Sequence, residues 1–79
     1  MVALGSGVAG RIKRYRESQH LSQKKLADMV ETSRGYLSAI ERGIKDPSYN
    51  FLTNFLEATG VSSEWILRGT GPMLYWRAK

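Results

Sequence analysis

The segment LSQKKLADMVETSRGYLSAIERG (residues 21–43) carries two short helical patterns separated by a polar interruption. Ser22 is a residue type that caps helix N-termini, and the apolar positions that follow it are Leu26, Ala27 and Val30. The tripeptide ETS (31–33) breaks this spacing, and Ser33 can cap a second helix that runs to about Arg42, where Gly43 provides a left-handed stop. Two short helices joined by a turn of about three or four residues cross at a steep angle. The segment therefore predicts a closely linked, steeply crossed pair of helices.

The second helix of this pair has an outer face made mostly of small side chains. At about 100° per residue, Leu37 and Ile40 fall on the side that faces the core. The opposite side holds Arg34, Gly35, Ser38 and Ala39. A helix that enters the major groove of DNA needs such a face, because bulky side chains would keep it away from the base edges. Glycine is roughly 1 kcal/mol less favourable than alanine in a helix. A need for close approach to the groove is a reason for the helix to carry Gly35 in spite of this cost.

Glu41 is a charged residue on the inner side of the same helix. Its position beside Leu37 turns the carboxylate partly inward, where an unpaired charge is costly. Arg16, at the edge of the apolar face of an earlier helix, is the candidate partner. The sequence thus predicts a structural ion pair between Arg16 and Glu41.

Three further helices are expected around this pair. The first is capped by Ser6, and its buried positions are Val8, Ile12 and Tyr15. The fourth is capped by Ser48 and ended by Gly60, and its core stripe is Leu52, Phe55 and Leu56. The fifth starts at Ser62, and its apolar residues are Trp65, Ile66 and Leu67. No alternating strand pattern competes with these five helices, so the predicted fold class is all-α, a compact five-helix domain.

Composition limits the functional classes. The 79 residues form one small domain with no cysteine and a single histidine, His20, which cannot supply a typical zinc site. The sequence contains no evident catalytic constellation, metal or cofactor motif, or small-molecule site, so an enzyme is not expected. It also contains no stretch that resembles a signal peptide or a membrane-spanning helix. The net charge is +5, and residues 11–25 hold six basic residues against one acidic residue, Glu17. Such a cluster indicates a polyanionic partner, although a solvated helix face would carry the same charges.

Residues 21–43 closely resemble the helix-turn-helix of the Cro/CI-type (Xre) family of phage and bacterial repressors. The likeness extends from about Arg11 to Leu67, and GVSSEWILRGTGPM (60–73) is similar to the end of the DNA-binding domain in phage CI repressors. It implies a lambda-repressor-like fold and a sequence-specific transcriptional regulator that binds double-stranded DNA. The family further implies a repressor that acts as a homodimer on a two-half-site operator, in the cytoplasm of a bacterium or a phage-infected host cell. Glu31 departs from the family, which commonly has a turn glycine there, and no oligomerisation or self-cleavage domain follows, as expected for a stand-alone regulator or a fragment.

The resemblance also implies roles for individual positions. The residues expected to face bases are Arg34, Gly35, Ser38 and Ala39. Those expected to contact phosphates are Gln23, Lys24, Tyr36, Arg42, Lys45 and Asn50. Other interpretations stay open, because Gln23 is an ordinary polar residue for a helix start, Lys24 can be simply solvated, and Tyr36 can pack at the edge of the core. The family often pairs an arginine with a glutamate at the positions of Arg16 and Glu41.

The chain is expected to divide into a flexible lead-in (1–7), a helix-turn-helix domain (8–69) and a C-terminal tail (70–79). The tail groups apolar side chains that are too few to bury themselves, a feature of association surfaces. With the fifth helix it predicts a dimer interface formed by Trp65, Met73, Leu74, Tyr75 and Trp76. Two alternatives remain. Trp76 can fold back onto its own core, or the chain can be a protein-interaction module, such as an antitoxin or accessory regulator, that docks through this tail.

Overall fold

The structure is a computed structural model that describes residues 4–74, with side chains described from Gly7 onward. This part of the chain forms five helices: α1 (Leu4–Ser18), α2 (Gln23–Val30), α3 (Arg34–Glu41), α4 (Tyr49–Thr59) and α5 (Ser63–Arg68). Between residues 4 and 74 the only strand-like pairing is an isolated antiparallel bridge that joins Val61 to Leu74. The predicted all-α, five-helix fold class is confirmed.

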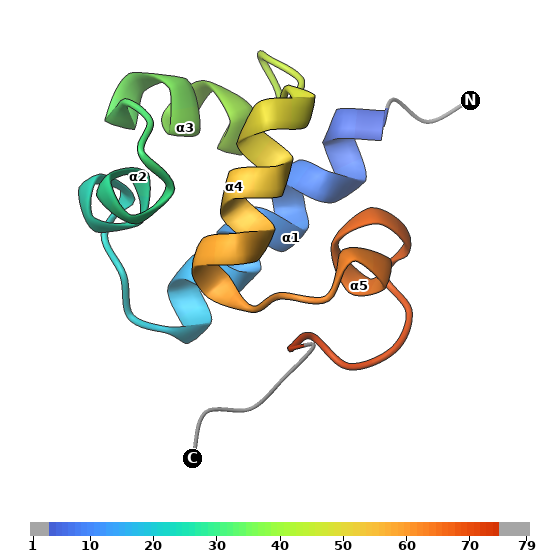
Figure 1. The fold of residues 1–79 in the computed structure, drawn as a ribbon. Coiled ribbons are helices and arrows are strands. Elements are labelled where there is room, and N and C mark those ends of the chain that lie inside the picture. The colour runs from blue at the N-terminus through green and yellow to red at the C-terminus, as the bar shows by residue number, and fades with distance from the viewer. Residues whose placement is uncertain (1–3, 75–79) are drawn as a thin grey trace.

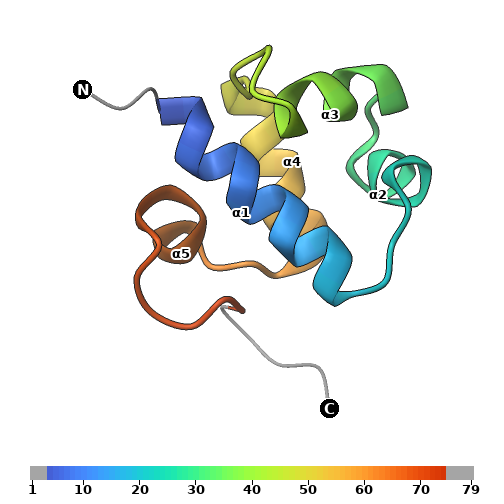
Figure 2. The same ribbon diagram turned by 180° about the vertical axis from the view of Figure 1, so that it is seen from behind.

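Helix α4 lies in the middle of the molecule and crosses α1, which runs behind it in Figure 1 and in front of it in Figure 2. Helices α2 and α3 lie together on one side of this crossing, and α5 lies on the other side. The closest packing between helices joins α5 and α3 to α1, and α2 to α3 and α4. The α2–α3 pair therefore sits at one end of the molecule, away from α5.

Serine residues begin four of the five helices. Each has an extended backbone and accepts a hydrogen bond from the amide three residues later; they are Ser22, Ser33, Ser48 and Ser62. Such a bond satisfies a backbone donor that the helix itself leaves unpaired, and is worth typically about 1 kcal/mol. All four caps were predicted, as were the left-handed conformation of Gly43 (φ 77°) after α3 and the end of α4 at Gly60, which has φ 75°.

The turn between α2 and α3 uses a glutamate where a glycine is expected. Glu31 has φ 63° and ψ 46°, the left-handed conformation, which costs a residue with a Cβ about 1–2 kcal/mol. Two amides close the turn: that of Glu31 donates to the carbonyl of Asp28 (3.2 Å), and that of Thr32 donates to the carbonyl of Ala27 (2.9 Å). The turn is therefore formed although Glu31 replaces the glycine of the family pattern, and the cost is backbone strain at Glu31.

The first helix starts earlier than predicted. It begins at Leu4, so Ser6 lies within α1 and is not its N-cap, and residues 4–7 are helical where a flexible lead-in was expected. Residues 1–3 lie outside the described part of the chain. Val8 and Ala9 are buried in the core, and packing of this kind supports a first turn whose own sequence, rich in glycine, favours helix only weakly.

The core is built as predicted on α1, α2 and α3 and differs from the prediction on α4. On α4 the buried residues are Phe51, Phe55 and Thr59, whereas the predicted Leu52 and Leu56 are half-buried at its edge. The two phenylalanines stack at 6.0 Å between ring centroids, and Phe55 also meets Tyr15 of α1 edge-on at 5.7 Å. Stacked aromatic rings dominate the choice of buried face because each buries a large apolar area. On α5, Trp65 and Ile66 are buried, whereas Leu67, the third apolar residue of this helix, is exposed.

Candidate nucleic-acid interface

Helix α3 presents the small-residue face to solvent. Leu37 and Ile40 are fully buried and fix the rotation of the helix; on the other side Arg34 and Gly35 are exposed, and Ser38 and Ala39 are half-exposed. A Cβ added to Gly35 would meet no atom within 4 Å. Packing within the chain therefore does not require a glycine at this position. The missing side chain lowers the helix propensity of α3 and leaves open space on its outer face.

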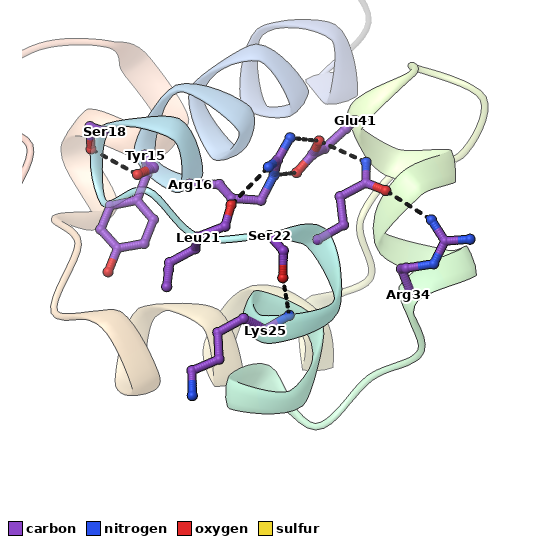
Figure 3. A network of polar contacts seen from close by, with 9 residues as sticks. Tyr15, Arg16, Ser18, Leu21, Ser22, Lys25, Arg34 and Glu41 are labelled. Carbon is purple, nitrogen blue, oxygen red and sulfur yellow. Dashed lines mark hydrogen bonds and ion pairs between the residues drawn. The ribbon is translucent and has the colours of Figure 1, made fainter.

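The predicted ion pair between α1 and α3 is present (Figure 3). Arg16 Nε donates to Glu41 Oε2 at 2.8 Å and Arg16 Nη2 donates to Glu41 Oε1 at 3.0 Å, a two-bond contact. The carboxylate side chain is only 2% exposed and the arginine 14%. The hydrogen bond to Glu41 raises the pKa of Arg16 above its ordinary value. Arg16 Nη1 also donates to the carbonyl of Leu21 at 2.9 Å, so one side chain ties α1 to α3 and to the start of α2.

Gln23 extends this network to the surface of α3. Its amide nitrogen donates to Glu41 Oε1 at 3.1 Å, and its amide oxygen accepts from Arg34 Nη1 at 3.3 Å. An ionised carboxylate only accepts hydrogen bonds and a guanidinium only donates them, so the two partners fix which way the amide points. Glu41 thus orients Gln23, and Gln23 contacts the guanidinium of Arg34 at the start of the outer face. Figure 3 labels Glu41 and Arg34 at the two ends of this series of bonds. The phosphate contact of Gln23 stays a prediction.

The other residues predicted at phosphates fall into two groups. Tyr36 is half-buried: its ring packs edge-on against Phe51 at 5.7 Å, and its hydroxyl accepts from the amide of Ser48 at 3.0 Å. This is the packing interpretation that the sequence left open. The exposed group consists of Lys24, Arg42, Lys45 and Asn50. Lys24 also lies 3.2 Å from Asp28, but a pair this exposed adds little stability and leaves the ammonium accessible.

Part of the basic cluster in residues 11–25 is structural. Arg11 Nε donates to the carbonyl of Ile66 at 2.9 Å, and Arg11 Nη2 donates to the carbonyl of Leu67 at 3.2 Å. Both carbonyls lie in the last turn of α5, where a cation satisfies unpaired acceptors and the helix dipole. With Arg16 also bound internally, the exposed cations of this cluster are Lys13, Arg14, Lys24 and Lys25. Sequence reasoning missed the role of Arg11, because its acceptors are main-chain atoms 55 and 56 positions away.

Of the residues expected at a dimer interface, the structure describes three, and these differ in how far they are exposed. Trp65 is 7% exposed and packs into the core of its own protomer, which leaves little of it for a partner. Met73 is half-buried against that core, and its carbonyl accepts from the amide of Ser62 at 2.8 Å. Leu74 is exposed beside Val61. Tyr75 and Trp76 lie outside the described residues. The interface therefore stays a prediction, and of its described residues Leu74 has the most free surface.

Among residues 4–74, no three histidine, cysteine, aspartate or glutamate side chains lie close enough together to hold a metal ion. None of the described helices combines the length and the apolar composition needed to cross a membrane.

Comparison with known proteins points in one direction. A family model described as helix-turn-helix matches residues 12–66. The chain is 40% identical over 53 residues to an uncharacterized HTH-type transcriptional regulator of Mycobacterium tuberculosis, covering 67% of this chain and 38% of that protein. It is 33% identical over 60 residues to YonR, an SPbeta prophage-derived uncharacterized HTH-type transcriptional regulator of Bacillus subtilis, covering 76% and 56%. The uncharacterized HTH-type transcriptional regulator YqaE of Bacillus subtilis is 31% identical over 58 residues, covering 73% and 50%. The chain thus spans between about two fifths and just over half of these relatives, and no solved structure matches it.

Proposed function

This chain belongs to the helix-turn-helix family of Cro/CI (Xre) type, and we propose that it is a sequence-specific DNA-binding transcriptional regulator that acts as a repressor. The observation that carries the proposal is the outer face of α3. It is exposed and small, and at its start is an arginine held by the Glu41–Gln23 network. A function of this kind needs no cofactor or catalytic residue.

In the proposed complex, α3 lies in the major groove of double-stranded DNA. Arg34 donates two hydrogen bonds to the acceptors of a guanine, and Ala39 offers a methyl group to a thymine methyl. Gly35 and Ser38 allow the helix to approach, and Lys24, Arg42, Lys45 and Asn50 contact phosphates. Because one arginine is the only side chain of this face able to make two bonds to a base, we expect modest base readout on top of a large electrostatic contribution.

The test selects binding sites from random duplexes and measures affinity for the selected and a scrambled duplex over a range of salt. Arg34→Ala should cost about 1–3 kcal/mol on the selected duplex and relax one base position in each half-site. Lys24→Ala should weaken both duplexes alike and flatten the salt slope by about 1.

Lys25→Ala is the matched control, because it removes an exposed lysine of the same helix that is not assigned to a phosphate. If Arg34→Ala binds both duplexes as tightly as the parent, α3 is not the reading helix. If the parent shows no salt-dependent duplex binding at all, the protein-interaction alternative replaces this function.

We further infer a homodimer, because one helix-turn-helix unit covers one half-site and two are needed about 34–36 Å apart for a two-half-site operator. Leu67 and Leu74 support a surface on α5 and the segment that follows it, since both are exposed and apolar. Removal of residues 75–79 should convert the dimer to a monomer in sedimentation and abolish cooperative operator binding. The truncation begins after Leu74 so that the bond from Ser62 to Met73 is kept. A truncated chain that remains dimeric would exclude residues 75–79 from the interface.

A further inference from the structure

Two large apolar side chains stand free at the loop between α3 and α4. Ile44 is 64% exposed and Tyr49 is 80% exposed; among residues 7–74, the exposed large hydrophobic residues are Ile44, Tyr49, Leu67 and Leu74. We call Ile44 and Tyr49 the loop patch. Nothing that has been assigned above uses either residue. Single exposed apolar residues are common on proteins, so exposure alone does not indicate a function for Ile44 and Tyr49. Their position relative to α3 is the informative feature.

The loop patch is held in a fixed position relative to α3. At the start of the loop, the amides of Ile44 and Lys45 both donate to the carbonyl of Ala39, at 2.9 and 3.3 Å. At its end, the amide of Ser48 donates to the hydroxyl of Tyr36, and Ser48 in turn caps α4 at the residue before Tyr49. Both ends of the loop are therefore bonded to α3, one of them through a residue of the outer face.

The loop that carries these two residues lies beside α3, the helix of the proposed DNA surface. The loop projects from the end of α3 at the top of Figure 1, and in Figure 2 it again lies next to α3 and the first turn of α4. It carries two exposed cations, Arg42 and Lys45, and one exposed acid, Asp46. A partner of this loop is accordingly one that presents negative charge together with apolar surface.

We propose that Ile44 and Tyr49 pack against deoxyribose carbons of the duplex that receives α3, next to the phosphates reached by Arg42 and Lys45. The inference rests on the proposed function. A sugar–phosphate backbone presents both required chemistries, since each apolar sugar lies between two charged phosphates. Contacts of this kind fix the protein on the duplex without reading bases. They also differ from phosphate contacts in a measurable way, because packing on sugar releases no counterions.

The experiment measures the affinity of the full chain for its selected duplex as a function of salt. The double variant Ile44→Ala, Tyr49→Ala should bind about tenfold more weakly at every salt concentration, with an unchanged salt slope. Lys45→Ala should instead flatten the slope by about 0.9, the effect of one phosphate contact. Asn54→Ala is the matched control, because it removes an exposed, uncharged side chain of α4, the helix that carries Tyr49, and has no assigned contact; it should leave the affinity unchanged.

Each outcome of this experiment supports or overturns the proposed contact between the loop patch and the deoxyribose carbons. Parental affinity in the double variant overturns the inference, and so does a loss of affinity that appears only as a change of salt slope. A double variant that becomes monomeric in sedimentation without DNA, when the parent is a dimer, assigns the loop patch to a second copy of the chain and also overturns it. Arg34→Ala is measured alongside. If that variant loses affinity and the double variant does not, the loop patch inference alone fails; if the parent binds no duplex, the proposed function fails.

Discussion

Two arginines on α1 bind different partners at the two ends of the domain. Arg16, toward α3, binds the buried carboxylate of Glu41, and through Gln23 this contact reaches the side chain of Arg34. Arg11, toward α5, binds two main-chain carbonyls at the end of a six-residue helix. Both are cations five positions apart in one basic stretch, yet one supports the proposed reading helix and the other fastens the last helix.

The difference lies in what is left behind when each arginine is removed. Loss of Arg16 leaves a carboxylate that is 2% exposed without its counter-ion, whereas loss of Arg11 leaves neutral carbonyls at a helix end that water can reach. An uncompensated buried charge costs several kcal/mol, while hydrogen bonds that water can replace are worth about 1 kcal/mol each. The comparison therefore predicts unequal consequences of breaking the two contacts.

The largest loss of stability is expected when the contact at the α3 end is broken. Glu41→Ala removes the ionic partner of Arg16 and should lower the free energy of unfolding by about 3–5 kcal/mol, a large share of the stability of a small domain. Urea unfolding followed by circular dichroism measures this loss. Arg16→Met combined with Glu41→Leu should recover much of it, because a buried pair can be replaced by apolar side chains. Parental stability of Glu41→Ala would contradict the burial of the pair.

A smaller effect is expected at the α5 end. Gly69 has φ 78°, and a Cβ there would lie 2.9 Å from Arg11 Nη1, so Gly69→Ala both strains the backbone and displaces the guanidinium. We expect a loss of about 3 kcal/mol, against about 2 kcal/mol for Arg11→Met, which removes two hydrogen bonds worth about 1 kcal/mol each. The two losses should be less than additive in the double variant, since both break the same contact.

Gly35→Ala is the control for this series, because its Cβ meets nothing and its gain in helix propensity should stabilise the domain by about 1 kcal/mol. Thermal unfolding of the four variants tests the pattern. Additive losses from Gly69→Ala and Arg11→Met would show that Arg11 does not act through the end of α5.

The smallest effect concerns pH and Tyr15, which lies on α1 between the two arginines. Burial raises the pKa of Tyr15 above its ordinary value of 10.0, so the folded state holds this proton more tightly than the unfolded state. The resulting stability is fully present below pH 10.0 and is lost as pH rises through the pKa of the folded state. Arg16, whose pKa is also raised, stays charged over this range. Tyr15→Phe should therefore remove part of the alkaline loss of stability, and an identical pH profile in this variant would assign that loss to other groups.

The proposed DNA surface was predicted more completely than the contacts that support it. The exposure of Arg34 and Gly35 and the burial of Leu37 and Ile40 follow from helical periodicity alone. The Arg16–Glu41 pair was predictable because a charge that points inward requires a partner. The packing of Tyr36 on Phe51 and the exposure of the loop patch were not predictable, since they depend on how the loop returns to α3.

What the sequence determined by itself is local: four serine caps, the glycines at the ends of α3 and α4, and the buried face of the first three helices. These features depend on residues within a few positions of one another. Only the tertiary structure decided that α4 buries Phe51 beside the predicted Phe55, in place of Leu52 and Leu56, because both faces are apolar and the two stacked rings occupy the core. It also decided that Arg11 binds the end of α5. Its acceptors are backbone carbonyls, which every residue possesses, so no sequence pattern marks them before the helices pack.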